Sequence, residues 1–82
     1  AYAIDRLAHA LTAVRDHVRK VTVYLSDENG PRGGEDKRCR VAVTLDTGRP
    51  VVVESRGASV TGAVDGAADR AGKVVHEELH RR

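Results

Sequence analysis

The spacing of apolar residues predicts a helix at each end of the chain. Apolar side chains recur every three or four residues from Ile4 to Val18, which is the period of an amphipathic helix. A second apolar stripe with helical spacing runs from Val60 to Leu79. Ser59 directly precedes this stripe, so we expect its hydroxyl to cap the second helix.

The region between the helical patterns is predicted to form three strands. Residues 21–26 and 38–46 alternate between apolar and polar side chains, and residues 51–56 begin with valines. Gly48 can adopt a positive φ and Pro50 can begin a strand, so a tight turn is expected between the last two strands. The order helix, three antiparallel strands, helix predicts an α+β fold with both helices on one face of the sheet. Its other face would carry Thr22, Tyr24, Arg38, Arg40, Thr44, Glu54 and Arg56.

Length and composition favour a single small domain spanning residues 1–82. The chain has no Phe, Trp or Met, so its core should consist mainly of Val, Leu and Ala. The net charge of +2 is too small to establish a nucleic-acid partner by itself. The single cysteine and the lack of an apolar run of about 18 residues predict a cytoplasmic, soluble protein without a membrane partner.

The segment joining the first two strands is longer than an ordinary hairpin needs, since short hairpins close with about two to five residues. It carries an acidic rim followed by a basic run. The pattern resembles that of single-domain bacterial members of the ribosome hibernation-promoting factor family, also called the sigma-54 modulation or ribosome-associated inhibitor family. The residues that carry the resemblance are Asp27, Asn29, Gly30, Pro31, Arg32, Gly33, Gly34, Asp36, Lys37, Arg38, Cys39 and Arg40.

The second helical segment, residues 60–70, is also similar to a stretch of that family, except that Thr61 replaces an aromatic residue. The resemblance implies a β-α-β-β-β-α fold like that of double-stranded-RNA-binding domains. The first strand of that fold has no counterpart here, so one sheet edge is expected to be bare. A bare edge can pair with another chain, which predicts a homodimer through this edge or a strand supplied by residues preceding Ala1.

The resemblance further implies a non-catalytic protein that binds the small ribosomal subunit and silences translation under stress. Binding of this kind needs cations near RNA phosphates and a matching surface. Arg38 and Arg40 should share a strand face, and Tyr24 could stack on an exposed base. The complete candidate RNA-binding set is Lys20, Tyr24, Arg32, Lys37, Arg38, Arg40 and Arg56. The alternative is a solvated face in which the arginines pair with Glu35, Asp36 or Glu54.

Two motifs invite an enzymatic interpretation, and we favour neither. Residues 76–80 match H-E-x-x-H, in which two histidines hold zinc, but only Arg81 and Arg82 follow and no downstream third ligand exists. Residues 30–37 are rich in glycine but lack the spacing of a phosphate-binding P-loop. Cys39 is expected to be a buried apolar residue and not a nucleophile. We therefore expect no catalytic activity, no cofactor and no metal.

A second functional class remains open at this point. The chain could be a small protein-interaction or oligomerisation module that keeps the fold without strong RNA binding. A continuous basic strip across Lys20, Arg38, Arg40 and Arg56 would favour RNA. Pairing of these residues with acids, together with a self-association surface, would favour the interaction module.

Overall fold

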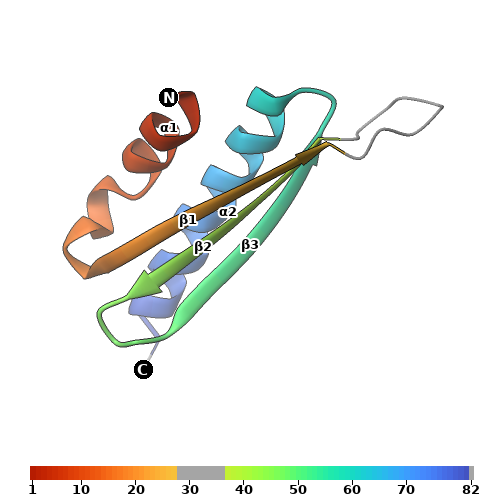
Figure 1. Cartoon of the computed structure of the whole chain (residues 1–82). Helices are drawn as coiled ribbons and strands as arrows, with labels where there is room; N and C mark the ends of the chain where they lie inside the picture. Colours follow the sequence, from red (N-terminus) through yellow and green to blue (C-terminus); the bar gives the residue numbers. More distant parts are fainter. Residues whose placement is uncertain (28–36, 82) are drawn as a thin grey trace.

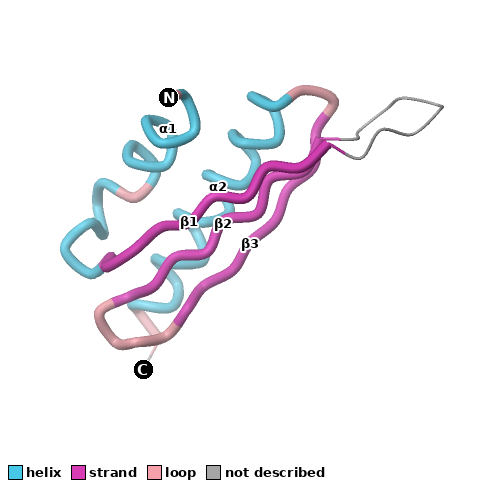
Figure 2. Tube along the Cα trace, viewed as in Figure 1, coloured by secondary structure: helices cyan, strands magenta, loops and turns pink. Residues whose placement is uncertain are grey.

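A computed structural model describes residues 1–27 and 37–81 and has the predicted α+β architecture (Figure 1). Helix α1 (Tyr2–Ala10) leads through a short 3-10 helix, η1 (Thr12–His17), into strand β1 (Val18–Asp27). Strands β2 (Lys37–Leu45) and β3 (Pro50–Gly57) follow, and helix α2 (Val60–Leu79) closes the fold. Figure 2 shows α2 passing behind the sheet, so that one face of the sheet is covered by helix and the other is open.

The apolar spacing predicted one continuous helix from Ile4 to Val18, and this prediction is wrong. The α-helix ends at Ala10, and the chain tightens into a 3-10 helix after Leu11. Leu11 and Val14 are both buried. A 3-10 helix has three residues per turn, so side chains three positions apart lie on the same side. The tighter helix therefore points both residues into the core, and Val18 already belongs to β1.

The sheet is antiparallel with the strand order β1-β2-β3. Val18 pairs with Leu45 whereas Lys20 pairs with Thr44, so the ladder has a bulge at this point. An extra residue in one strand shifts the alternation of its side chains. The bulge consequently lets Val18 and Val21 face the helices while Lys20 faces the open side.

The core lies between α2 and strands β2 and β3. Its largest fully buried side chains are Leu45, Val41, Val43, Val64, Val75 and Cys39, which confirms the buried position predicted for Cys39. Small residues of α2 allow the helix to approach the sheet closely. A Cβ atom added to Gly66 would lie 2.2 Å from the Ser55 hydroxyl oxygen of β3.

Two local predictions are confirmed at the ends of elements. Gly48 has a φ of 88° in the turn between β2 and β3, and β3 begins at Pro50. The Ser59 hydroxyl accepts a hydrogen bond from the Gly62 N–H at 3.1 Å and so caps α2. None of the helices in ranges 1–27 and 37–81 combines the length and hydropathy that a membrane-crossing helix needs.

Helix α1 is attached mainly to α2. Arg6 bridges the two helices, with its Nη2 at 2.6 Å from Asp69 Oδ1 and its Nε at 3.2 Å from Asp65 Oδ1. The Tyr2 hydroxyl donates a hydrogen bond to the same Asp65 carboxylate. These contacts hold the N-terminal helix beside the C-terminal one.

Strand β1 is less well covered than its neighbours. Helix α2 packs on β3 and β2, and neither helix makes comparable contacts with β1. Val21 and Leu25 point to the helix side of the sheet, in register with buried residues of β2, yet they are 36% and 51% exposed. Ile4 and Val60, which also belong to the apolar stripes of the sequence, are exposed as well, so these stripes extend beyond the actual core.

Candidate nucleic-acid interface

The open face of the sheet brings together most of the predicted RNA-binding residues. Strand pairing places Tyr24 opposite Arg40 and Arg40 opposite Glu54, which makes one row across the sheet. The next row contains Ser26, Arg38 and Arg56 in the same way. Lys20 lies four residues before Tyr24, on the same face of β1. The face therefore combines an aromatic side chain with several cations.

Tyr24 and Arg40 are the centre of this arrangement. They are cross-strand neighbours, and such neighbours have Cβ atoms about 4.5–5.5 Å apart. Tyr24 is 57% exposed, and Arg40 is exposed as well. Within the described ranges, no acidic side chain forms a salt bridge with Arg40 or Lys20. Both cations are thus available to a negatively charged ligand.

Arg38 has a different role from Arg40. Its Nη1 lies 3.2 Å from Glu54 Oε2, in a diagonal salt bridge between β2 and β3. The Glu54 partner expected in the solvated-face alternative is therefore present for this arginine. The charge of Arg38 is therefore partly compensated before any ligand binds.

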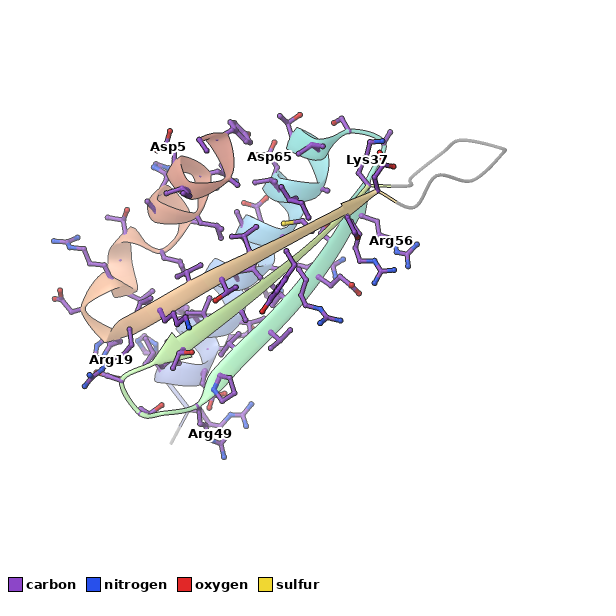
Figure 3. All side chains as sticks on the ribbon, in the orientation of Figure 1. Asp5, Arg19, Lys37, Arg49, Arg56 and Asp65 are labelled. Carbon is purple, nitrogen blue, oxygen red and sulfur yellow. The ribbon has the colours of Figure 1, made fainter. Side chains whose placement is uncertain are left out.

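Lys37 does not belong to the open face. It pairs with Asp27 and Gly57 at the end of the sheet. Lys37 is two residues from Cys39 in β2, so both side chains point toward the helices. Its Nζ lies 2.8 Å from Asp27 Oδ2. Figure 3 shows Lys37 and Arg56 at the same end of the sheet with side chains pointing in different directions. Arg32, and the loop motif between residues 28 and 36, lie outside the described residues.

One cation beside this face was missed by sequence reasoning. Arg70 of α2 reaches the outer side of β3, where its Nη1 donates a hydrogen bond to the Glu54 carbonyl oxygen at 3.1 Å. Together with Glu54, Ser55 and Arg56 it lines a shallow hollow of about 340 Å³. Only the packing of α2 against β3 brings Arg70 to this edge. The exposed position of Arg70 on an amphipathic helix was the only signal in the sequence.

The opposite end of the domain has a larger hollow, of about 830 Å³, between η1, the turn after β2 and the end of α2. His17 Nδ1 lies 3.1 Å from Asp46 Oδ2, and Arg49 Nη1 lies 3.3 Å from Glu78 Oε2. Arg49 marks this end in Figure 3, far from Arg56. Asp46 and Glu78 place acidic side chains in this hollow, so it is a weaker candidate for an anionic ligand than the open face.

The residues of the H-E-x-x-H motif lie at the end of α2. The rings of His76 and His80 have centroids 4.1 Å apart, and His80 Nδ1 donates to the His76 carbonyl oxygen at 2.8 Å. That hydrogen bond occupies one ring nitrogen of His80. Among residues 1–27 and 37–81, no three His, Cys, Asp or Glu side chains are grouped as metal ligands. The expectation of a non-enzymatic protein stays a prediction.

Cys39 is enclosed by the core, with no exposed surface. Burial raises the pKa of its thiol, because the charged thiolate is poorly solvated there. A catalytic cysteine requires the opposite shift and access to solvent. Cys39 therefore lacks the features of a catalytic cysteine.

No protein-family model and no curated protein matches the chain.

Proposed function

We propose that this protein binds RNA through the open face of its sheet, without catalysing a reaction. The observation that carries the proposal is the pairing of exposed Tyr24 with exposed Arg40, on the face that α1 and α2 leave open. Aromatic side chains in a basic groove stack on unpaired bases, with a gain of about 1–3 kcal/mol per base. Arg40 supplies a cation on the neighbouring strand, and Lys20 supplies one four residues before Tyr24 on the same face of β1.

The proposed partner is rRNA of the small ribosomal subunit, and the proposed consequence is inhibition of translation under stress in the bacterial cytoplasm. This part of the proposal rests on the resemblance of residues 27–40 to hibernation-promoting factors. The open face agrees with it in chemistry, because unpaired rRNA presents both bases and phosphates. The salt bridge between Arg38 and Glu54 leaves Lys20, Tyr24 and Arg40 as the principal contacts, with Arg56 and Arg70 at the edge.

The test compares two double variants that remove the same charge. Lys20→Gln with Arg40→Gln removes cations from the open face, whereas Lys73→Gln with Arg81→Gln removes them from exposed positions on and after α2. Each variant is co-sedimented with small ribosomal subunits over a range of salt concentrations. For each cation that contacts a phosphate, the slope of log K against log salt changes by about 0.7–0.9.

The open-face variant should bind more weakly and flatten this slope by about 1.5, while the control should bind as the wild type does. Tyr24→Ala should weaken binding without changing the slope, since stacking involves no phosphate. Equal binding of both double variants would reject the open face as the RNA-binding surface. Absence of any binding by the wild type would reject the ribosomal partner.

The second candidate function is a protein-interaction module. The exposed apolar residues of β1 favour this alternative, as does its outer edge, which pairs with no strand of ranges 1–27 and 37–81. It uses the edge and the helix side of β1, not the open face. The two functions can therefore be separated by variants on different sides of the same strand.

A further inference from the structure

The shallow hollow of about 340 Å³ at the outer edge of β3 has an unusual mixture of charges for part of an RNA-binding surface. Its lining of Glu54, Ser55, Arg56 and Arg70 offers a carboxylate, a hydroxyl and two guanidinium groups. Glu54 is the only acidic residue of the open face within the ranges that the structure describes. Because a carboxylate repels RNA phosphates, Glu54 opposes binding unless it contacts another group of the RNA.

The contacts of Glu54 and Arg70 leave both side chains able to bind a ligand. Arg38 Nη1 lies 3.2 Å from Glu54 Oε2, and Arg70 Nη1 donates to the Glu54 carbonyl oxygen at 3.1 Å. An ionised carboxylate has about four positions at which it accepts a hydrogen bond, so the Glu54 carboxylate keeps acceptor capacity beside Arg38. Arg70 is exposed, and guanidinium planes stack on unpaired bases. The hollow thus combines hydrogen-bond acceptors with a stacking surface.

The hydrogen-bonding pattern of these groups selects among the RNA bases. The carboxylate requires donors on the ligand, whereas the guanidinium groups require acceptors. Guanine carries adjacent N1–H and N2–H donors on its Watson–Crick edge, and the acceptors O6 and N7. Adenine and cytosine place an amino group beside an acceptor nitrogen, and uracil has a single N–H between two carbonyl groups. Guanine is therefore the base that offers a donor to each oxygen of a carboxylate.

We infer that this hollow binds one unpaired guanine of the RNA and that Glu54 is the residue that specifies the base. The inference rests on the proposed RNA-binding function of the open face. The Glu54 carboxylate accepts hydrogen bonds from guanine N1–H and N2–H, and the Arg70 guanidinium stacks on the base. Tyr24 lies in the same row of the sheet but two strands away, at about 10 Å, so it stacks on a different base of the same RNA.

The test measures the binding of short single-stranded RNA oligomers by fluorescence anisotropy. Each oligomer is oligouridine with one central guanosine, inosine or adenosine. Inosine lacks only the N2 amino group of guanosine, and adenosine is a purine without the N1–H donor. Glu54→Gln changes the hollow, and Glu78→Gln makes the same change at the opposite end of the domain. Glu78 is a matched control, because its Oε2 also contacts an arginine, with Arg49 Nη1 at 3.3 Å.

The wild type and Glu78→Gln should bind the guanosine oligomer about tenfold more tightly than the adenosine oligomer, with the inosine oligomer between them. Glu54→Gln should lose this preference, because an amide presents one donor and one acceptor in place of two acceptors. Its affinity for the adenosine oligomer should not fall, since a negative charge near the phosphates has been removed. If Glu54 had only a structural role, the substitution would weaken all three oligomers alike, and the inference would be overturned.

Two further variants separate this inference from the proposed function. Tyr24→Ala should weaken all oligomers by a similar factor and keep the guanosine preference, whereas Arg70→Lys keeps the charge, loses the planar group and should reduce the preference. Circular dichroism checks that each variant is folded. Binding of all oligomers by the wild type without a guanosine preference, or a preference that survives Glu54→Gln, would overturn the guanine site and leave RNA binding by the open face standing. Absence of binding to every oligomer would overturn both.

Discussion

Leu25 of β1 and Cys39 of β2 are direct cross-strand neighbours, yet Leu25 is 51% exposed and Cys39 is completely buried. Both side chains point to the same side of the sheet. The difference arises because α2 covers β2 and stops short of β1. A boundary between core and surface thus runs along the sheet, between two paired strands.

The first prediction compares two leucines on either side of this boundary. Leu45→Ala should lower the free energy of unfolding by about 2–5 kcal/mol, because Leu45 is 1% exposed and its truncation leaves a cavity. Leu25→Ala should cost less than about 1 kcal/mol, since much of that side chain already contacts solvent. Urea unfolding of both variants measures the difference. Similar losses would show that β1 is covered in solution, for instance by self-association.

The second prediction concerns stability at alkaline pH. Burial raises the pKa of Cys39, so the folded state holds the thiol proton more tightly than the unfolded state does. The contribution of Cys39 to the free energy of unfolding is complete below pH 9.0, the ordinary pKa of a thiol. This contribution is lost as the pH rises toward the raised pKa. The free energy of unfolding should therefore fall more steeply above pH 9.0 in the wild type than in Cys39→Ala.

The pKa of Tyr2 is raised as well, but Tyr2 is present in both the wild type and Cys39→Ala. Its hydrogen bond to Asp65, more than desolvation, raises the pKa of its hydroxyl. Its contribution therefore cancels when the wild type is compared with Cys39→Ala. Parallel stability profiles of the two proteins between neutral and alkaline pH would contradict the assignment to Cys39.

The third prediction tests the close approach between the end of β3 and the start of α2. A Cβ atom on Gly57 would lie 2.8 Å from the Ala63 nitrogen and 3.1 Å from the Gly62 carbonyl carbon, both of which are backbone atoms. Gly57→Ala should therefore cost about 1–3 kcal/mol. Gly48 provides the comparison. A side chain there would have open space around it, but the backbone φ of 88° is unfavourable for most residues. Gly48→Asn should be tolerated better than Gly57→Asn, since Asn adopts a positive φ at little cost. The reverse order in thermal unfolding would refute this explanation.

The fourth prediction concerns the N-cap of α2. Ser59→Ala removes the acceptor for the Gly62 N–H and should destabilise the domain by about 1 kcal/mol. Ser59→Asp keeps an acceptor and places a negative charge at the positive end of the helix dipole, so it should retain most of the stability. Chemical denaturation of the three proteins gives the ranking. An alanine variant as stable as the aspartate variant would show that the cap contributes little.

Local patterns predicted most elements of this fold, because local chemistry determines them, but they did not predict the 3-10 helix after Leu11. The alternation in β2, the positive φ of Gly48 and the cap at Ser59 all follow from residues close together in sequence. The burial of β1 could not be predicted in this way. Val21 and Leu25 carry the pattern of a half-buried strand, but their exposure depends on where the helices lie over the sheet.

In the candidate site too, local patterns predicted some features, whereas others depend on packing between distant elements. Alternation along the strands correctly placed Tyr24, Arg38, Arg40 and Arg56 on one face. Lys37 was grouped with the arginines because of its proximity in sequence, although the same alternation directs it to the other face. Arg70 became a neighbour of Arg56 only through packing of α2 on β3, which no local pattern encodes.

The attachment of α1 to α2, far more than to the sheet, also determines how the domain opens. The bridges from Arg6 to Asp65 and Asp69 are partly exposed, and Leu7 is the buried residue of α1. Detaching α1 therefore costs less than separating α2, with its six buried residues, from β2 and β3. Helix α1 can then detach as a separate unit while the rest stays folded. Amide hydrogens of α1 should therefore exchange with solvent faster than those of β2 and α2, so hydrogen exchange would identify α1 as the first helix to open.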